Sequence, residues 1–135
     1  MIHLDPLPTL MIADDDPVVQ ELLKTCLSST FEVVGIAPDS EVAVELARRS
    51  QPDAALVDVD MPKGGGMRAV RGILEVAPDT AIVVLSGDES DTLVRQLVVA
   101  GASAYRRKGI ETHLLAQSLI DSIASRGHER RASAA

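Results

Sequence analysis

Three consecutive aspartates, Asp14, Asp15 and Asp16, follow directly on an apolar segment at residues 9–13. One aspartate at such a place is explained by a helix that begins there, but a helix N-terminus does not require three. Two carboxylates about 4 Å apart repel each other by roughly 4 kcal/mol at an effective dielectric constant of about 20. A further acid brought in from another segment would therefore call for a divalent cation. A few hard oxygen ligands that leave room for water and phosphate oxygens favour Mg²⁺ over a caged Ca²⁺.

Three more reactive side chains, Asp58, Ser86 and Lys108, follow other apolar segments. Asp58 ends a segment that is otherwise apolar, so burial would fix its orientation. Beside a metal ion, its carboxylate can attack phosphorus and form an acyl phosphate. The Lys108 ammonium and the Ser86 hydroxyl supply the positive charge and the hydrogen-bond donor that transferred phosphoryl oxygens need. Together these residue types indicate phosphoryl transfer.

Five short apolar segments alternate with segments of helical period, and this alternation positions the reactive residues. Strand-helix repetition gives parallel strands joined by right-handed crossovers. The sequence therefore predicts an α/β fold, a doubly wound sheet of five parallel strands with five helices. Ligands bind such sheets at the carboxyl ends of the strands, where the reactive residues lie. The predicted strands are Thr9–Ala13, Phe31–Ala37, Ala54–Asp58, Ala81–Ser86 and Ala104–Arg107.

The intervening segments predict five helices from their periodicity and their capping residues. Pro17 opens the first helix, Asp39 and Ser40 cap the second, and Asp88 or Ser90 caps the fourth. The third helix lies within residues 66–77. The side chains expected to face the core are Val18, Val19, Leu22, Leu23, Cys26 and Leu27 in the first helix, Val42, Ala43, Leu46 and Ala47 in the second, Leu93, Val94, Leu97 and Val98 in the fourth, and Leu115, Leu119 and Ile123 in the fifth.

The composition limits the class of protein. The 135 residues contain 13 Lys plus Arg and 20 Asp plus Glu, so the formal net charge is −7. This acidic balance argues against direct binding of nucleic acid or of an anionic membrane surface, and no apolar run reaches the roughly 18 to 20 residues of a membrane helix. The single cysteine excludes an internal disulfide, and three distant histidines give neither a zinc site nor a Ser-His-Asp triad. We expect a cytoplasmic protein.

The domain organisation is simple. We predict an N-terminal extension at residues 1–8 and one domain at residues 9–125. Residues 126–135 lose the periodicity and the large apolar side chains, so they are expected to form a flexible tail or the start of a linker.

The motifs, taken jointly and in order, carry a resemblance to a known family. They are Asp14-Asp15-x-Pro17, Asp58-x-x-Met61-Pro62 followed by Gly66, Ser86 at the end of its segment, Ala100-Gly101-Ala102-Ser103-Ala104-Tyr105, and Lys108 three residues after Tyr105. Over residues 9–125 the chain resembles the receiver domain of two-component response regulators, of the chemotaxis-regulator type. The resemblance implies a flavodoxin-like sheet with strand order 2-1-3-4-5.

The resemblance also implies a role for each motif residue. Asp58 would accept a phosphoryl group from a phosphohistidine on a sensor histidine kinase or phosphotransfer protein. The Asp14, Asp15 and Asp58 carboxylates and the Asp60 backbone carbonyl would hold Mg²⁺. Ser86 and Lys108 would bind the phosphoryl oxygens.

A switch follows from the same resemblance. Ser86 and Tyr105 would move on phosphorylation and reshape the face formed by the fourth helix, fifth strand and fifth helix, which would control an output domain or partner and could form a homodimer. A static edge residue is the alternative for Tyr105. The chain would catalyse its own phosphorylation and dephosphorylation at Asp58 rather than turn over a substrate as an enzyme.

Several positions depart from the family pattern. Gly109 stands where the family has a proline, often after a cis peptide bond, so the loop after Lys108 is expected to be trans or more mobile. Arg106 and Arg107 replace aliphatic residues, and we expect one of them to point outward. The segment Lys63-Gly64-Gly65-Gly66 is a flexible loop that lacks the Gly-Lys-Ser/Thr ending of a phosphate-binding P-loop.

Two alternatives remain. Asp58-x-Asp60 after an apolar strand also resembles haloacid-dehalogenase-type phosphatases, in which the first aspartate is the nucleophile and the second a general acid, but Asp14 and Asp15 would then be unexplained. The other alternative is a receiver-like binding module that is not phosphorylated. The complete set of five reactive groups argues against it, while Gly109 keeps it open.

Overall fold

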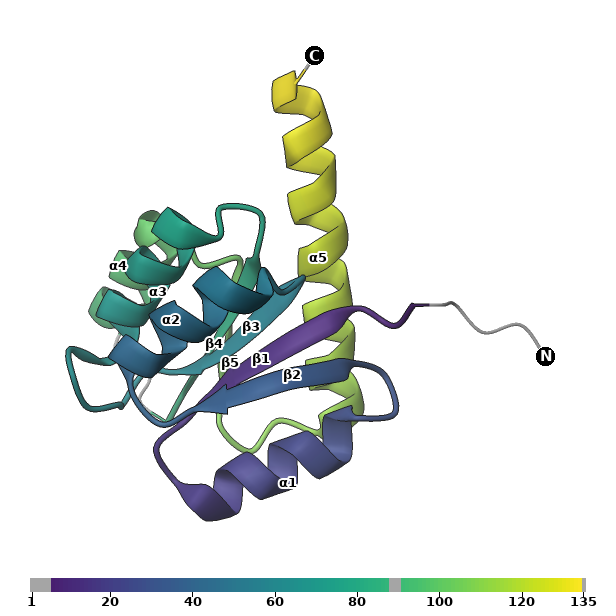
Figure 1. Ribbon diagram of the computed structural model, residues 1–135. Helices are drawn as coiled ribbons and strands as arrows, with labels where there is room; N and C mark the ends of the chain where they lie inside the picture. Colours follow the sequence, from purple (N-terminus) through teal and green to yellow (C-terminus); the bar gives the residue numbers. More distant parts are fainter. Residues whose placement is uncertain (1–5, 88–90, 135) are drawn as a thin grey trace.

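The computed structural model describes residues 6–87 and 91–134. Five parallel strands form one sheet in the order β2-β1-β3-β4-β5 (Figure 1). The fold class and the strand order are therefore confirmed. The second strand begins one residue later than predicted, and the other four have the predicted bounds. The strands are β1 (Thr9–Ala13), β2 (Glu32–Ala37), β3 (Ala54–Asp58), β4 (Ala81–Ser86) and β5 (Ala104–Arg107).

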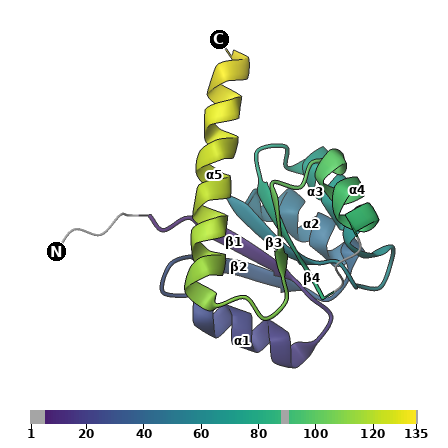
Figure 2. The same ribbon diagram turned by 180° about the vertical axis from the view of Figure 1, so that it is seen from behind.

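Five helices connect and cover the strands. Figure 1 and Figure 2 show α1 and α5 on one face of the sheet and α2, α3 and α4 on the other. The helices are α1 (Pro17–Leu27), α2 (Ser40–Ser50), α3 (Gly65–Val76), α4 (Asp91–Ala100) and α5 (Thr112–Ala134). No helix among the described residues is both long and apolar enough to cross a membrane.

The core consists of two aliphatic layers, one on each face of the sheet. Alternate residues of β1 point to opposite faces: Leu10 and Ile12 pack with residues of α1 and α5, whereas Met11 and Ala13 pack with residues of α2, α3 and α4. All residues of β3 and β4 are buried. Because both faces of these strands are covered, their sequences are apolar without polar alternation.

The first two helices begin where the sequence predicts, each after an aspartate cap. The Asp16 carboxylate accepts a hydrogen bond of 2.9 Å from the Val18 N–H and so caps α1, and the Asp39 carboxylate accepts one of 2.9 Å from the Val42 N–H and so caps α2. The caps proposed for α4, Asp88 or Ser90, lie outside the described residues.

Some predicted core positions are wrong. Val18 and Leu22 in α1 are 74% and 59% exposed, Val42 in α2 is 39% exposed, and Val98 in α4 is 48% exposed. Each lies at the edge of its apolar stripe, and α1 and α4 bury a narrow face. In α1 only Leu27 is fully buried, and in α4 only Leu97 is, among the described side chains.

The helix α5 continues to Ala134, past residue 126, where we expected a flexible tail or the start of a linker. Figure 1 shows its last turns extending beyond the sheet. Residues 126–134 contain no proline, and three arginines, two alanines and one glutamate among these nine residues favour a helix. A helix already nucleated by the docked residues Leu115 and Leu119 can continue without an apolar face of its own. A role of this segment as the start of a linker stays a prediction.

Candidate functional site

The carboxyl ends of β1 and β3 bring three acids together. Asp14 and Asp15 follow β1 directly, and Asp58 is the last residue of the neighbouring strand β3. One carboxylate oxygen from each lies within 4.8 Å of those from the other two. Asp14 and Asp58 are buried, whereas Asp15 is exposed. The sequence placed these acids at one edge of the sheet, and the structure brings them within reach of one shared ion.

Asp14 is held in place through both its side chain and its backbone. Its Oδ1 accepts a hydrogen bond of 2.9 Å from the Asp16 N–H, and its carbonyl accepts one of 2.6 Å from the Gln20 side chain. Burial raises the pKa of Asp14, and the negative charges of Asp58 and Asp15 raise this pKa further, against the Asp16 N–H and the Lys108 ammonium, which lower it. The folded site therefore disfavours a negative charge that nothing else balances.

Raising the pH is expected to lower the stability of the metal-free domain through Asp14. Its folded pKa lies above the ordinary value of 3.8, so between these two values the folded chain binds more protons than the unfolded chain. The free energy of unfolding then falls as the pH rises through that range. Asp14→Asn keeps the acceptor for the Asp16 N–H but cannot ionise, so this variant should lack the loss. Urea unfolding in EDTA at increasing pH tests this, and parallel curves for the two proteins would contradict it.

Asp58 is paired with a lysine from the end of β5. The Lys108 ammonium lies 2.9 Å from Asp58 Oδ1, and the Asp60 N–H donates a hydrogen bond of 3.2 Å to the same oxygen. Asp58 is 3% exposed and the Lys108 side chain 41% exposed. The hydrogen bond to Asp58 raises the pKa of Lys108, so the lysine stays positively charged. Since both contacts use Oδ1, they leave Oδ2 as the oxygen that can react while the pairing persists.

Ser86 and Lys108 are joined through the backbone. The Lys108 N–H donates a hydrogen bond of 3.0 Å to the Ser86 carbonyl, and Ser86 is buried at the end of β4. Tyr105, half-buried on β5 opposite Val84, packs against the layer that contains α2, α3 and α4. The two proposed switch residues thus lie on neighbouring strands, Ser86 at the end of β4 and Tyr105 on β5, which Lys108 follows directly.

The loop after Lys108 has a conformation that proline cannot adopt. Gly109 has a φ of 92°, whereas the proline ring fixes φ near −65°. The departure from the family pattern is therefore a different backbone conformation. Arg106 and Arg107 are both exposed, because β5 is the edge strand and little of the chain covers them.

A cavity of about 570 Å³ adjoins the acids. One side is formed by the acidic residues and Lys108, and the other by apolar side chains of α1 and the start of α5. The apolar lining includes Val19, Leu22, Leu23, Cys26, Ile110 and Leu115. Sequence reasoning assigned most of these side chains to the core, and the amphipathic period that found them does not distinguish a core face from a cavity wall.

Comparison with known proteins agrees with this geometry. A family model described as the response regulator receiver domain matches residues 10–120. The transcriptional regulatory protein DegU of Brevibacillus brevis is 34% identical over 112 residues, which cover 82% of this chain and 48% of that protein. The response regulator GacA of Pseudomonas aeruginosa is also 34% identical over 112 residues, with coverage of 82% and 52%. The chain spans about half the length of these curated relatives.

A solved structure supports the same assignment. The crystal structure of a two-component response regulator of the LuxR family from Aurantimonas sp. SI85-9A1 superposes with a TM-score of 0.82 at 26% identity, covering 88% of this chain and 86% of that one. The family match extends over most of the chain and includes all five reactive side chains. The chain therefore belongs to the receiver domains of two-component response regulators.

Proposed function

We propose that this receiver domain is a phosphorylation-dependent switch whose acceptor is Asp58. The donor is a phosphohistidine on a sensor histidine kinase or phosphotransfer protein. The observation that carries the proposal is the environment of the buried Asp58 carboxylate, which lies 2.9 Å from the Lys108 ammonium and within 4.8 Å of carboxylate oxygens of Asp14 and Asp15. Negative carboxylates beside a positive ammonium suit an Asp58 oxygen that attacks phosphorus, and they also suit the anionic phosphoryl group that Asp58 carries afterwards.

The transfer exchanges one bond to phosphorus for another. The phosphorus–nitrogen bond of the donor imidazole breaks, a bond to an Asp58 carboxylate oxygen forms, and the imidazole takes up a proton. Attack by Oδ2 keeps Oδ1 paired with Lys108. The Lys108 ammonium and the Ser86 hydroxyl then stabilise the negative oxygens of the phosphoryl group.

The acids fit Mg²⁺, which receiver domains typically bind. Mg²⁺ takes oxygen ligands at about 2.0 to 2.1 Å in an octahedron, so opposite ligands lie about 4 Å apart. The oxygens of Asp14, Asp15 and Asp58, within 4.8 Å of one another, need only small side-chain movements to meet this requirement. The Asp60 backbone carbonyl is the fourth proposed ligand. Bound Mg²⁺ supplies positive charge that offsets the carboxylates and the phosphoryl oxygens.

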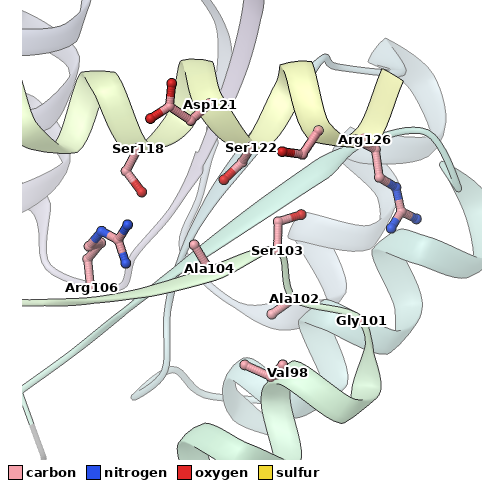
Figure 3. Close-up of a pocket in the computed structure, with 11 residues that line it drawn as sticks. Val98, Gly101, Ala102, Ser103, Ala104, Arg106, Ser118, Asp121, Ser122 and Arg126 are labelled. Carbon is pink, nitrogen blue, oxygen red and sulfur yellow. The ribbon is translucent and has the colours of Figure 1, made fainter. Parts of the chain in front are cut away.

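The output surface is the face formed by α4, β5 and α5, which includes Tyr105. A cavity of about 400 Å³ lies on this face. Figure 3 shows Ser118 and Ser122 of α5 pointing from the helix toward β5 in this cavity. Ser118 Oγ is buried without a hydrogen-bond partner among the described residues. A polar, incompletely packed contact between α5 and the edge strand suits a surface that changes on phosphorylation. An output domain, a partner or a second copy of the chain would contact it, and relatives named as transcriptional regulators favour an output in transcription.

Labelling with acetyl phosphate tests the proposal. In the presence of Mg²⁺, intact-mass measurement should show one phosphoryl group on each chain, and labelling should stop there. A haloacid-dehalogenase-type phosphatase would instead hydrolyse a small phosphomonoester over many cycles, and an unphosphorylated binding module would show no mass increase. Sustained turnover or an unchanged mass would each refute the switch.

A further inference from the structure

The loop after Asp58 contains three consecutive residues in left-handed backbone conformation. Lys63, Gly64 and Gly65 have φ angles of 68°, 105° and 67°. Glycine adopts such angles readily, but it is equally free to adopt many others, and a lysine rarely adopts them. Something outside the loop must therefore select this one conformation.

Ser40, the first residue of α2, contacts both sides of this turn. Its hydroxyl donates a hydrogen bond of 2.6 Å to the Gly65 carbonyl, and its N–H lies 3.4 Å from the Pro62 carbonyl. Ser40 is 0% exposed, and a buried hydroxyl needs a partner. Its partner here belongs to the loop rather than to its own helix, so the side chain fixes the loop to α2.

The neighbouring residue of α2 adds charged contacts to the same loop. Glu41 lies 3.7 Å from the Lys63 ammonium and 3.6 Å from the Arg68 guanidinium, and Arg68 donates a hydrogen bond of 2.9 Å to the Lys63 carbonyl. These side chains are about half exposed, so water weakens each pair. The hydrogen bond of the buried Ser40 side chain is therefore the stronger restraint.

The helix that carries Ser40 is a firm support. A Cβ added to Gly72 of α3 would lie 2.4 Å from a methyl group of Val44, so only glycine allows α2 and α3 to approach this closely. The Asp39 carboxylate caps the first turn of α2. The loop thus contacts a helix whose own position is fixed by packing.

The loop conformation is transmitted to the acidic site through the backbone. The Gly66 N–H donates a hydrogen bond of 2.9 Å to the Val59 carbonyl, and a Cβ on Gly66 would lie 2.9 Å from Val59 Cα. Val59 precedes Asp60, whose N–H donates to Asp58 Oδ1. A shift of residues 63–65 would therefore move the backbone beside the acceptor.

We propose that Ser40 is a positioning residue that holds residues 59–66 in the arrangement in which the Asp60 backbone serves the Asp58 site. The inference deepens the proposed function and rests on it for the role of the Asp60 carbonyl toward Mg²⁺. Among the described residues, the hydrogen bonds of Ser40 outside its own helix go to this loop and not to the carboxylates of Asp14, Asp15 or Asp58.

Two measurements on the unphosphorylated protein test this inference. Loss of one hydrogen bond corresponds to a change of about fivefold in the loop-opening equilibrium. We therefore expect Ser40→Ala to speed hydrogen exchange in peptides covering residues 59–67 about fivefold, and to weaken Mg²⁺ binding by calorimetry by a similar factor. Ser50→Ala is the matched control, because the Ser50 hydroxyl donates to Leu46 within α2 itself. It should change neither value.

The results distinguish a failure of this inference from a failure of the proposed function. Wild-type exchange and Mg²⁺ affinity in a folded Ser40→Ala protein would overturn the inference, as would equal losses in Ser50→Ala. If Ser40→Ala does not fold, Ser40→Cys keeps the side-chain size while weakening the donor, and the same two readouts apply. A wild-type protein that neither binds Mg²⁺ nor accepts phosphate would refute the proposed function, and hydrogen exchange would still decide whether Ser40 holds the loop.

Discussion

The Asp58→Asn protein is expected to take up no phosphoryl group from acetyl phosphate and Mg²⁺, whereas the wild-type chain takes up one. Asparagine has nearly the size of aspartate but lacks the carboxylate that attacks phosphorus. Loss of the nucleophile removes the reaction itself, so the effect should be complete rather than partial. Intact-mass measurement after equal incubation times gives the comparison directly.

Asp60→Asn is the matched control for this experiment. The Asp60 side chain is exposed. Its proposed contributions to the site come from the backbone, the N–H that donates to Asp58 Oδ1 and the carbonyl that would bind Mg²⁺, and the substitution preserves both. The variant should be labelled like the wild type. In a phosphatase the Asp60 carboxyl would act as a general acid, and its loss would slow the reaction by about 10² to 10⁴. Equal labelling of the wild type and Asp58→Asn would contradict the assignment of the acceptor.

Mg²⁺ is expected to raise the melting temperature of the domain by about 10 °C at a concentration 100 times its dissociation constant. Binding to the folded state alone contributes about 2.7 kcal/mol at that ratio, and in a domain of this size 1 kcal/mol shifts Tm by about 4 °C. Repulsion among the three acids destabilises the folded state when no metal is bound, and bound Mg²⁺ relieves this repulsion. Asp15→Ala removes one proposed ligand from an exposed position, so it should lose most of the increase without loss of the fold.

Glu75→Ala controls for the change in net charge. Glu75 is exposed on α3 and is not among the acids that lie close together, so its removal should leave the Mg²⁺ response unchanged. Thermal melts of the three proteins, with and without Mg²⁺, complete the comparison. A full response in Asp15→Ala would remove this residue from the metal site.

The fold could be predicted because its main signals are local and agree with one another. Apolar segments without alternation identify strands buried on both faces, and helical periods between them leave parallel crossovers as the connection. The clustering of Asp14 and Asp58 followed from one rule, that the carboxyl ends of parallel strands meet at one edge. The strand order itself came from the resemblance to receiver domains, since the periodicity of the segments does not determine which strands are neighbours.

The features that sequence reasoning missed depend on contacts across the chain. The hydrogen bond from Ser40 to Gly65 joins residues 25 positions apart. In the sequence, Asp39 and Ser40 indicate only a helix cap, so nothing there points to a contact with a distant loop. The left-handed conformation of Gly109 depends on the path of one loop. The continuation of α5 was missed because an apolar stripe was required of every helical segment, although a docked helix can extend past its own contacts.

Chemical mapping of the acyl phosphate tests the central claim most directly. Sodium borohydride reduces an aspartyl phosphate to homoserine, so treatment of the labelled wild-type protein followed by peptide sequencing identifies the acceptor without any substitution. We predict homoserine at position 58 and at no other position. Homoserine at Asp14, Asp15 or Asp60, or a labelled chain that contains no homoserine, would contradict the account.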